Sequence, residues 1–320
     1  MLNWISRKGL VACVVTTILG GAQGAAAETI ALGFAGGSGP TDMPAVLALD
    51  ALKAQGWSTE VIEFDSPDIL TQALLNGQVQ IAAMGPATAF AADLAGADLK
   101  MVAKNNRNDF MILAAPGIAD CDGLDGRIVA IHSTGSTTTA HLMRYMESTC
   151  PDAKPNIIVL SGSANRVAAL LNGQIEGTIV RLEDWMAITG GQDDRAHILA
   201  MLVDEQPTLL TQAIVVSAGK LEEDRPAIEA FVTALDAEFA AIYADPAAFA
   251  AKAAPHLKEI DPAKLADVYT ALAEAQMFPL NEGLSQEQVA DTIAFYEAAG
   301  KAEPGKLTPD TVADFSFTGK

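Results

Sequence analysis

The sequence has few of the residues that build metal centres and redox sites. In 320 residues there are three cysteines and four histidines, and aromatic residues make up 6%. The sequence contains neither a Cys-x-x-Cys nor a His-Glu-x-x-His motif, and the separation of His132 and His141 is not a metal-ligand spacing. Ser136 and His141 would not share a face of a helix, and nothing presents Ser136 as a nucleophile elbow. The sequence therefore predicts no metal site, no cofactor and no catalytic centre.

Basic residues are also scarce. The chain has 20 Lys and Arg against 40 Asp and Glu, which gives a net charge of -20. An acidic surface repels polyanions, so we expect no nucleic-acid partner and no anionic membrane surface. The net charge does not identify a small ligand, because an enclosed site can have a local field of its own.

Long apolar runs are missing, and the longest candidate lies at the N-terminus. Arg7 and Lys8 precede the apolar stretch 10–19, and Ala25 to Ala27 form an A-x-A cleavage pattern. A membrane span needs about 20 apolar residues, so residues 1–27 are predicted to be a secretory signal peptide that is removed on export. Cys13 lies in a sequence like a lipoprotein box, and a lipid anchor at Cys13 stays an open alternative.

Two cysteines remain after residues 1–27, namely Cys121 and Cys150. An exported protein meets a compartment that permits disulfides, so we predict that the two are bridged. Closing the loop between them would stabilise the fold by about 3 to 4 kcal/mol in the chain-entropy model. The alternative is a pair of unlinked buried thiols.

The most informative feature present is an internal repeat. The sequence ALLNGQ occurs at residues 73–78 and again at 169–174, and apolar runs and glycine-rich loops keep the same offset around both copies. Such a repeat indicates a duplicated lobe, and two similar lobes in one chain imply a ligand cleft between them.

Apolar runs alternate with amphipathic helical segments in each copy, which predicts an α/β fold with mostly parallel sheets flanked by helices. We expect lobe I to contain residues 28–115 and 211–320, with lobe II between them at 116–210. The strand expected at 110–115 would complete lobe I. Crossings near 115–117 and 207–213 would form a two-strand hinge, and residues from 221 onward are predicted to be helices packed on lobe I.

Four turns fall where strands end and helices begin, which is where open α/β sheets bind ligands. Hydroxyls supply rotating donors there, and glycines allow close approach of the backbone. Taken singly, each turn could be no more than a loop with a helix cap. The residues predicted to bind ligand in these turns are Gly37, Ser38, Thr41, Asp42, Gly85, Pro86, Thr88, Ser133, Thr134, Ser136 and Thr137.

Arg181 and Trp185 belong to the fourth turn. Arg181 follows an apolar run, so its guanidinium could hold an anionic ligand group through two parallel hydrogen bonds. The competing interpretation is a salt bridge with Glu183 or Asp184. Trp185 is predicted either to form a wall of the pocket or to belong to the core.

Several segments carry a resemblance to a known family. The sequence resembles the periplasmic solute-binding proteins of ABC transporters, in particular the alkanesulfonate, taurine and nitrate group, which is NMT1/THI5-like. A glycine-rich first loop takes the place of that group's more usual strand-end aromatic residue. The segments that carry the resemblance are LGFAGGSGP, ALLNGQVQIAAMGPAT, STGSTTTAHLMRYM, GQIEGTIVRLEDW, LNEGLSQEQVADTIAFYEAAGK and LTPDTVADFSF.

The resemblance implies a two-lobed periplasmic-binding-protein-like fold of type II that closes by hinge motion. It also implies a monomer, located in the periplasm, that captures a small anionic or polar organic solute and delivers it to an inner-membrane permease. Sulfonates, carboxylates, nitrate and pyrimidine-like molecules are the expected ligands. The alternatives are a receptor of a tripartite (TRAP-type) transporter, a sensory binding module and, less expected, an enzyme of the same fold.

Overall fold

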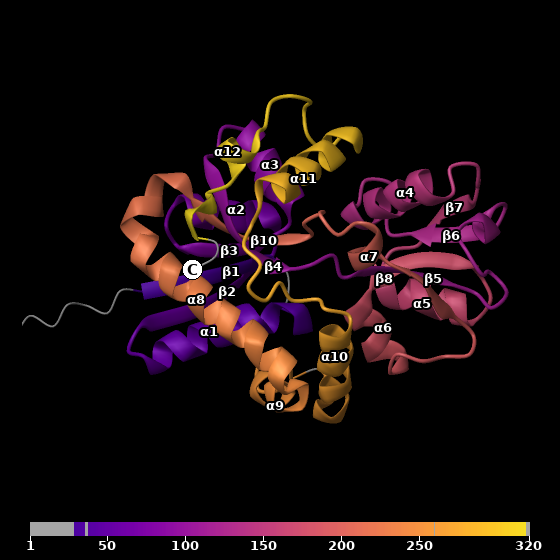
Figure 1. The fold of residues 1–320 in the computed structure, drawn as a ribbon, viewed down its shortest axis with the longest axis horizontal. Coiled ribbons are helices and arrows are strands. Elements are labelled where there is room, and N and C mark those ends of the chain that lie inside the picture. Colours follow the sequence, from indigo (N-terminus) through magenta and orange to yellow (C-terminus); the bar gives the residue numbers. More distant parts are fainter. Residues whose placement is uncertain (1–28, 36–37, 259, 318–320) are drawn as a thin grey trace, which may run out of the picture.

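The computed structural model describes residues 29–35, 38–258 and 260–317. The predicted signal peptide with Cys13 and the predicted ligand residue Gly37 lie outside the described residues. Figure 1 shows two α/β lobes side by side, each built around one sheet of five strands. This is the two-lobed architecture that the sequence predicted.

The first sheet has the strand order β2-β1-β3-β10-β4. β1, β2 and β3 run parallel to one another, and β10 runs antiparallel to both of its neighbours. β1 is buried over its five central residues, as expected of an inner strand of a covered parallel sheet. The bounds are Thr29–Ala35 for β1, Ser58–Phe64 for β2, Ile81–Met84 for β3, Leu99–Asn106 for β4 and Gln212–Ser217 for β10.

The second sheet repeats this plan in the order β7-β6-β8-β5-β9. β6 and β7 correspond to β1 and β2, β8 corresponds to β3, and the antiparallel strand β5 takes the place of β10. The duplication inferred from the sequence therefore extends to the order of the strands. The bounds are Phe110–Ala114 for β5, Ile128–Ile131 for β6, Asn156–Val159 for β7, Gly177–Arg181 for β8 and His197–Met201 for β9.

The position of β5 corrects one expectation. The strand predicted at 110–115 was assigned to lobe I, but β5 pairs with β8 and β9 in the second sheet. The first crossing between sheets therefore lies between β4 and β5, at residues 107–109, and not at 115–117. An apolar run shows that a strand is buried but not which distant strand it pairs with. The second crossing falls between α7 and β10, within the predicted range 207–213.

The helices after the parallel strands are also repeated. Both ALLNGQ copies end a helix, and Gly77 and Gly173 follow with φ of 73° and 69°, the left-handed conformation that glycine adopts without strain. Ser66 begins α2 as a cap and accepts a hydrogen bond from the backbone of Ile69. The bounds are Met43–Ala54 for α1, Pro67–Leu75 for α2, Pro86–Leu94 for α3, Thr137–Thr149 for α4, Ser163–Leu171 for α5 and Leu182–Thr189 for α6.

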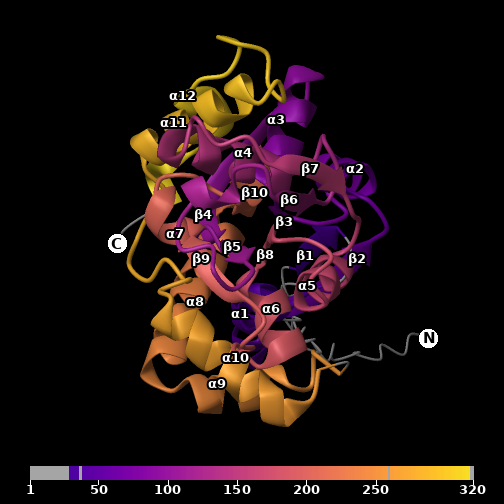
Figure 2. The same cartoon turned by 90° about the vertical axis from the view of Figure 1, so that its right-hand side faces the viewer.

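The C-terminal helices cover the first lobe. α8 packs along α1, and α12 contacts α3 and β4. α10 also contacts α6 of the second lobe, so it bridges the two lobes on the side seen at the bottom of Figure 2. In the described residues no helix has both the length and the apolar content that a membrane crossing requires. The bounds are Leu202–Glu205 for α7, Leu221–Ala244 for α8, Pro246–Ala253 for α9, Pro262–Glu274 for α10, Gln286–Ala298 for α11 and Pro309–Val312 for α12.

A disulfide joins Cys121 to Cys150, with 5.7 Å between their Cα atoms. Cys121 precedes a short 3-10 turn at Asp122–Leu124, and Cys150 ends α4. Both residues are buried in the core of the second lobe. The predicted bridge is thus confirmed, and the alternative of two free thiols does not apply.

Candidate functional site

Some of the sequence-predicted ligand residues fall into two groups where the lobes meet. One group belongs to a set of buried and half-buried polar residues that we call the inter-lobe cluster. The other lines an open cavity between α4 and α11. The inter-lobe cluster consists of Thr41, Asp42, Asn105, Asp109, Arg181, Glu183 and Gln212.

The first turn and the start of α6 meet directly across the lobes. The Glu183 carboxylate accepts hydrogen bonds from the backbone amide and the hydroxyl of Thr41, both at 3.0 Å. Gly39 allows this contact, because a Cβ atom at that position would lie 3.1 Å from Glu183 Oε1. The amide group of Gly39 donates to Asp42 at 2.9 Å. The backbone donors that were predicted to receive an anionic ligand thus bind two carboxylates of the protein itself.

Asp42 connects this turn to the two segments that cross between the lobes. Its Oδ1 atom accepts hydrogen bonds from Gln212 at 2.9 Å and from Asn105 at 3.4 Å. The Asn105 amide also donates to Gln212 at 2.8 Å, so the three side chains form a closed network. A bulge in the pairing of β4 with β10 leaves Asn105 without a partner in the register, next to the pair Asn106 and Gln212.

Arg181 is bound by Asp109. Its guanidinium donates to the Asp109 carboxylate at 2.9 Å, and Glu183 is 3.9 Å away. The guanidinium also lies 5.5 Å from the centre of the Phe110 ring. The salt-bridge interpretation of Arg181 therefore describes the structure, with Asp109 as the main partner and Glu183 as a secondary one.

Burial makes the three carboxylates of the cluster hard to ionise. Asp109 is fully buried, and loss of water raises its pKa, while Arg181 opposes the rise. Burial likewise raises the pKa of Asp42, and it raises the pKa of Glu183 to about 7. The pKa of Arg181 is raised chiefly by Asp109, so the guanidinium stays charged. The cluster thus holds three carboxyl groups against one guanidinium, and the Arg181 side chain keeps 33% of its surface exposed.

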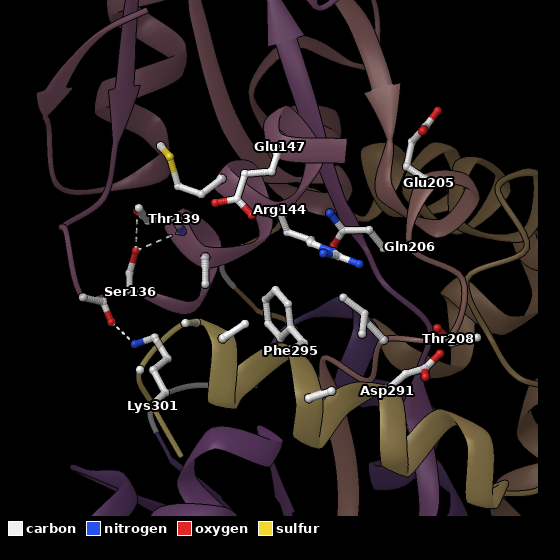
Figure 3. A pocket seen from close by; sticks show the side chains of 18 of the residues that line it. Ser136, Thr139, Arg144, Glu147, Glu205, Gln206, Thr208, Asp291, Phe295 and Lys301 are labelled. Carbon is white, nitrogen blue, oxygen red and sulfur yellow. Dashed lines mark hydrogen bonds between the residues drawn. The ribbon is translucent and has the colours of Figure 1, made fainter. Parts of the chain in front are cut away.

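The open cavity has a volume of about 680 Å³. Figure 3 shows Arg144, on α4, and Phe295, on α11, facing one another across it. Lys301 donates to the backbone carbonyl of Gly135 across the lobes. Charged side chains of both signs line the cavity. Lys301 is half-buried, and the exposed ones are Arg144, Glu147, Glu205 and Asp291.

Two of the four predicted residues of the third turn belong to this cavity. Thr134 and Ser136 line it. Ser136 caps α4 by accepting a hydrogen bond from the backbone of Thr139, and its hydroxyl donates to the carbonyl of Ser133. Thr137 is the first residue of α4. The cap interpretation therefore describes Ser136, and its hydroxyl is already bonded within the turn.

Five other predicted residues belong to neither region. Gly85, Pro86 and Thr88 begin α3, where Thr88 donates its backbone amide to Gly85. Ser38 donates both its amide and its hydroxyl to Glu63 at the end of β2. Trp185 is 1% exposed, and its indole donates to the carbonyl of Gly191, so it belongs to the core.

The sequence interpretation missed the polar half of the cluster. Asn105 and Asp109 are fully buried, although they come from a polar stretch for which the sequence predicted no role in the site. The signal was present in the chain, because this polar stretch joins two apolar strands at a crossing between lobes. A polar connection there is buried as soon as the lobes meet.

Comparisons with known proteins agree with this architecture. A family model described as NMT1/THI5 like matches residues 52–249, which is more than half of the chain. No curated protein sequence is similar to this chain.

Two of the similar solved structures are sulfonate-binding proteins. The periplasmic aliphatic sulphonate binding protein SsuA from Escherichia coli has a TM-score of 0.68 and 18% identity, over 90% of this chain and 98% of that chain. The alkanesulfonate-binding protein SsuA from Xanthomonas axonopodis pv. citri, bound to MOPS, has a TM-score of 0.63 and 20% identity, over 90% and 99%.

A third similar structure has a different ligand in its name. The periplasmic nitrate-binding protein NrtA from Synechocystis PCC 6803 has a TM-score of 0.63 and 12% identity, over 91% of this chain and 87% of that chain. At these identities the likeness establishes a shared fold and leaves the ligand to the site itself.

Proposed function

Because the chain belongs to the NMT1/THI5-like family, we propose that it is the substrate-binding component of an ABC-type importer. It captures a small polar organic solute between its two lobes and releases it unchanged. One observation carries this proposal. Polar residues from the strand ends of both lobes meet at an interface beside two chain crossings, which are the hinge that closure requires.

Opening and closing would act on the inter-lobe cluster. Separating the lobes breaks the two hydrogen bonds between Thr41 and Glu183, and this admits water and solute. Closure expels the water, which strengthens every electrostatic contact with the solute. A solute that binds the closed form better shifts the population toward it.

The proposed setting is the periplasm. Residues 1–27 act as the signal peptide, and the mature protein is a monomer that presents its loaded form to an inner-membrane permease. The names of the similar structures support this setting, since they include periplasmic binding proteins and a component of an ABC-type import system.

Two measurements on the mature protein test the proposal. Thermal unfolding in a panel of small organic solutes identifies ligands, because a molecule that binds only the folded state raises the melting temperature. Small-angle scattering with the same solutes should show a smaller radius of gyration when the lobes close. Recovery of a chemically altered solute after incubation would overturn the proposal in favour of an enzyme.

A further inference from the structure

We infer that the inter-lobe cluster binds an organic cation carrying N–H donors, an aliphatic amine or a guanidine, and not the anion that the turns suggested. This inference rests on the proposed function, because it assigns a ligand class to the same inter-lobe site. It follows from what the groups of the cluster already bind and from what they leave unpaired.

The donors of the first turn are already occupied, and one guanidinium nitrogen of Arg181 is bound to a carboxylate. Glu183 accepts both donors of Thr41, and Asp42 accepts the amide of Gly39. Arg181 donates to Asp109. An anionic ligand would have to displace the protein's own carboxylates, and those carboxylates would then be buried beside it without partners.

Two unpaired groups of the cluster are acceptors, whereas the neighbouring Asn106 leaves both its amide nitrogen and its amide oxygen unpaired and so favours neither kind of ligand. Among the described residues, neither Asp109 Oδ1 nor Asn105 Oδ1 has a hydrogen-bond partner, and both side chains are fully buried. The other oxygen of Asp109 binds Arg181, and the Asn105 amide nitrogen binds Asp42 and Gln212. The unpaired oxygens therefore belong to groups that already face the cluster. A buried acceptor without a donor is costly, and a ligand N–H would relieve that cost.

The charges point the same way. The cluster holds three carboxylates, from Asp42, Asp109 and Glu183, against the single guanidinium of Arg181. Each carboxylate accepts a hydrogen bond from a different residue, and the three carboxylates do not surround one common point. Such a spread suits a ligand with several N–H groups better than a spherical metal ion, whose ligands must surround one centre.

Isothermal titration with four probes tests the inference. Putrescine and agmatine are the cations, and taurine and nitrate are the anions. We expect agmatine or putrescine to bind and neither anion to do so. Binding should be about tenfold tighter at pH 8 than at pH 6, because a cation favours ionised Glu183. The charged and titratable groups that act on Glu183 are Arg181, Asp109, Asp42 and the hydroxyl of Tyr269 from α10.

Asp42→Asn tests whether the ligand is a cation or an anion. Removing this charge should weaken cation binding about tenfold or more, whereas it would tighten the binding of an anion. Glu183→Gln should weaken cation binding in the same direction and abolish its pH dependence. Glu60→Gln, which removes an exposed carboxylate of β2 outside the cluster, should leave binding unchanged. Thermal unfolding of each variant checks that it is folded.

The outcomes separate the inference from the proposed function. Binding of taurine or nitrate that tightens in Asp42→Asn overturns the cation inference and leaves solute capture intact. A folded protein that binds none of the four probes, or that binds zinc or calcium in place of the amines, also overturns it. If no solute produces closure in the scattering experiment, the proposed function fails as well.

Discussion

The inter-lobe cluster and the cavity between α4 and α11 both lie where the two lobes meet. They differ in whether their arginine is paired with a buried carboxylate or exposed to water. Figure 1 places α4 and α11 on one side of the interface, with α6 and α10 on the other. In the cluster, Arg181 is bound to a carboxylate that has no contact with water. In the cavity, Arg144 is exposed and, within the described residues, forms no ion pair.

The difference teaches that burial, and not the number of charges, decides what a charged residue does at this interface. Exposed charges of either sign cost little free energy, and ion pairs between them contribute little, because water screens them. Buried charges must be paired, and a buried polar group that has no partner within the protein is available to a ligand. For this reason the cluster carries information about the solute that the larger cavity does not.

The difference between the two regions should be largest when Arg181 and Arg144 are each replaced by alanine. Arg181→Ala leaves the buried carboxylate of Asp109 without its partner, and we expect a loss of about 3 kcal/mol or more in the free energy of unfolding. Arg144→Ala should change it by less than about 0.5 kcal/mol. Urea denaturation at pH 7 measures both. Equal losses would show that the Arg181–Asp109 pair is no more desolvated than the cavity.

The pH dependence of stability sharpens the comparison next. The pKa of Glu183 is raised to about 7 in the folded protein, above its ordinary value of 4.5. Between these values the folded state binds more protons than the unfolded state, so the free energy of unfolding falls as pH rises from about 4.5 through 7. Over this pH range the ionisation of Glu183 lowers the free energy of unfolding by about 3 kcal/mol.

Glu183→Gln should remove most of this slope. Asp42 and Asp109 retain slopes of the same sign, since burial also raises their pKa values. Denaturation midpoints at pH 5 and pH 8 provide the measurement. Glu147→Gln, which changes an exposed carboxylate of the cavity, should leave the slope as it is in the natural protein. A slope unaffected by Glu183→Gln would contradict the burial of that carboxylate.

Two glycines give the smallest expected effect. Gly39→Ala would place a Cβ atom 3.1 Å from Glu183 Oε1, so the carboxylate must shift, at a cost of about 1 kcal/mol. The φ of Gly39 is -107°, which alanine adopts readily, so the effect is steric. Gly135→Ala on the cavity meets no atom within 4 Å and should be neutral. Thermal unfolding distinguishes them, and an equally neutral Gly39→Ala would show that the lobes do not close as tightly as described.

The sequence predicted most of the fold because its signals are local. Ser66 and Ser136 cap helices next to them in the chain, and Asn76 with Gly77 follows the end of α2. The duplication then predicted the second lobe from the first. β5 was assigned to the wrong sheet because its pairing with β8 joins residues far apart in the chain, and an apolar run does not specify such a partner.

The site was predicted less well for the same physical reason. Thr41, Asp42 and Arg181 were predicted because strand ends and helix starts mark ligand positions, and the structure brings them together in the cluster. Asp109 was not, although it binds Arg181 from 72 residues away. Whether a polar residue is solvated or buried depends on which surfaces meet across the interface. The residues next to it in the sequence do not indicate this.

The exchange of β5 and β10 has a consequence for how the protein can be divided. A gene fragment for residues 116–210 would encode β6 to β9 without the strand that separates β8 from β9. The remaining parts of the chain would keep β5 with no sheet to enter. The duplicated halves have thus lost their modularity, and neither half should yield a stable domain when produced alone.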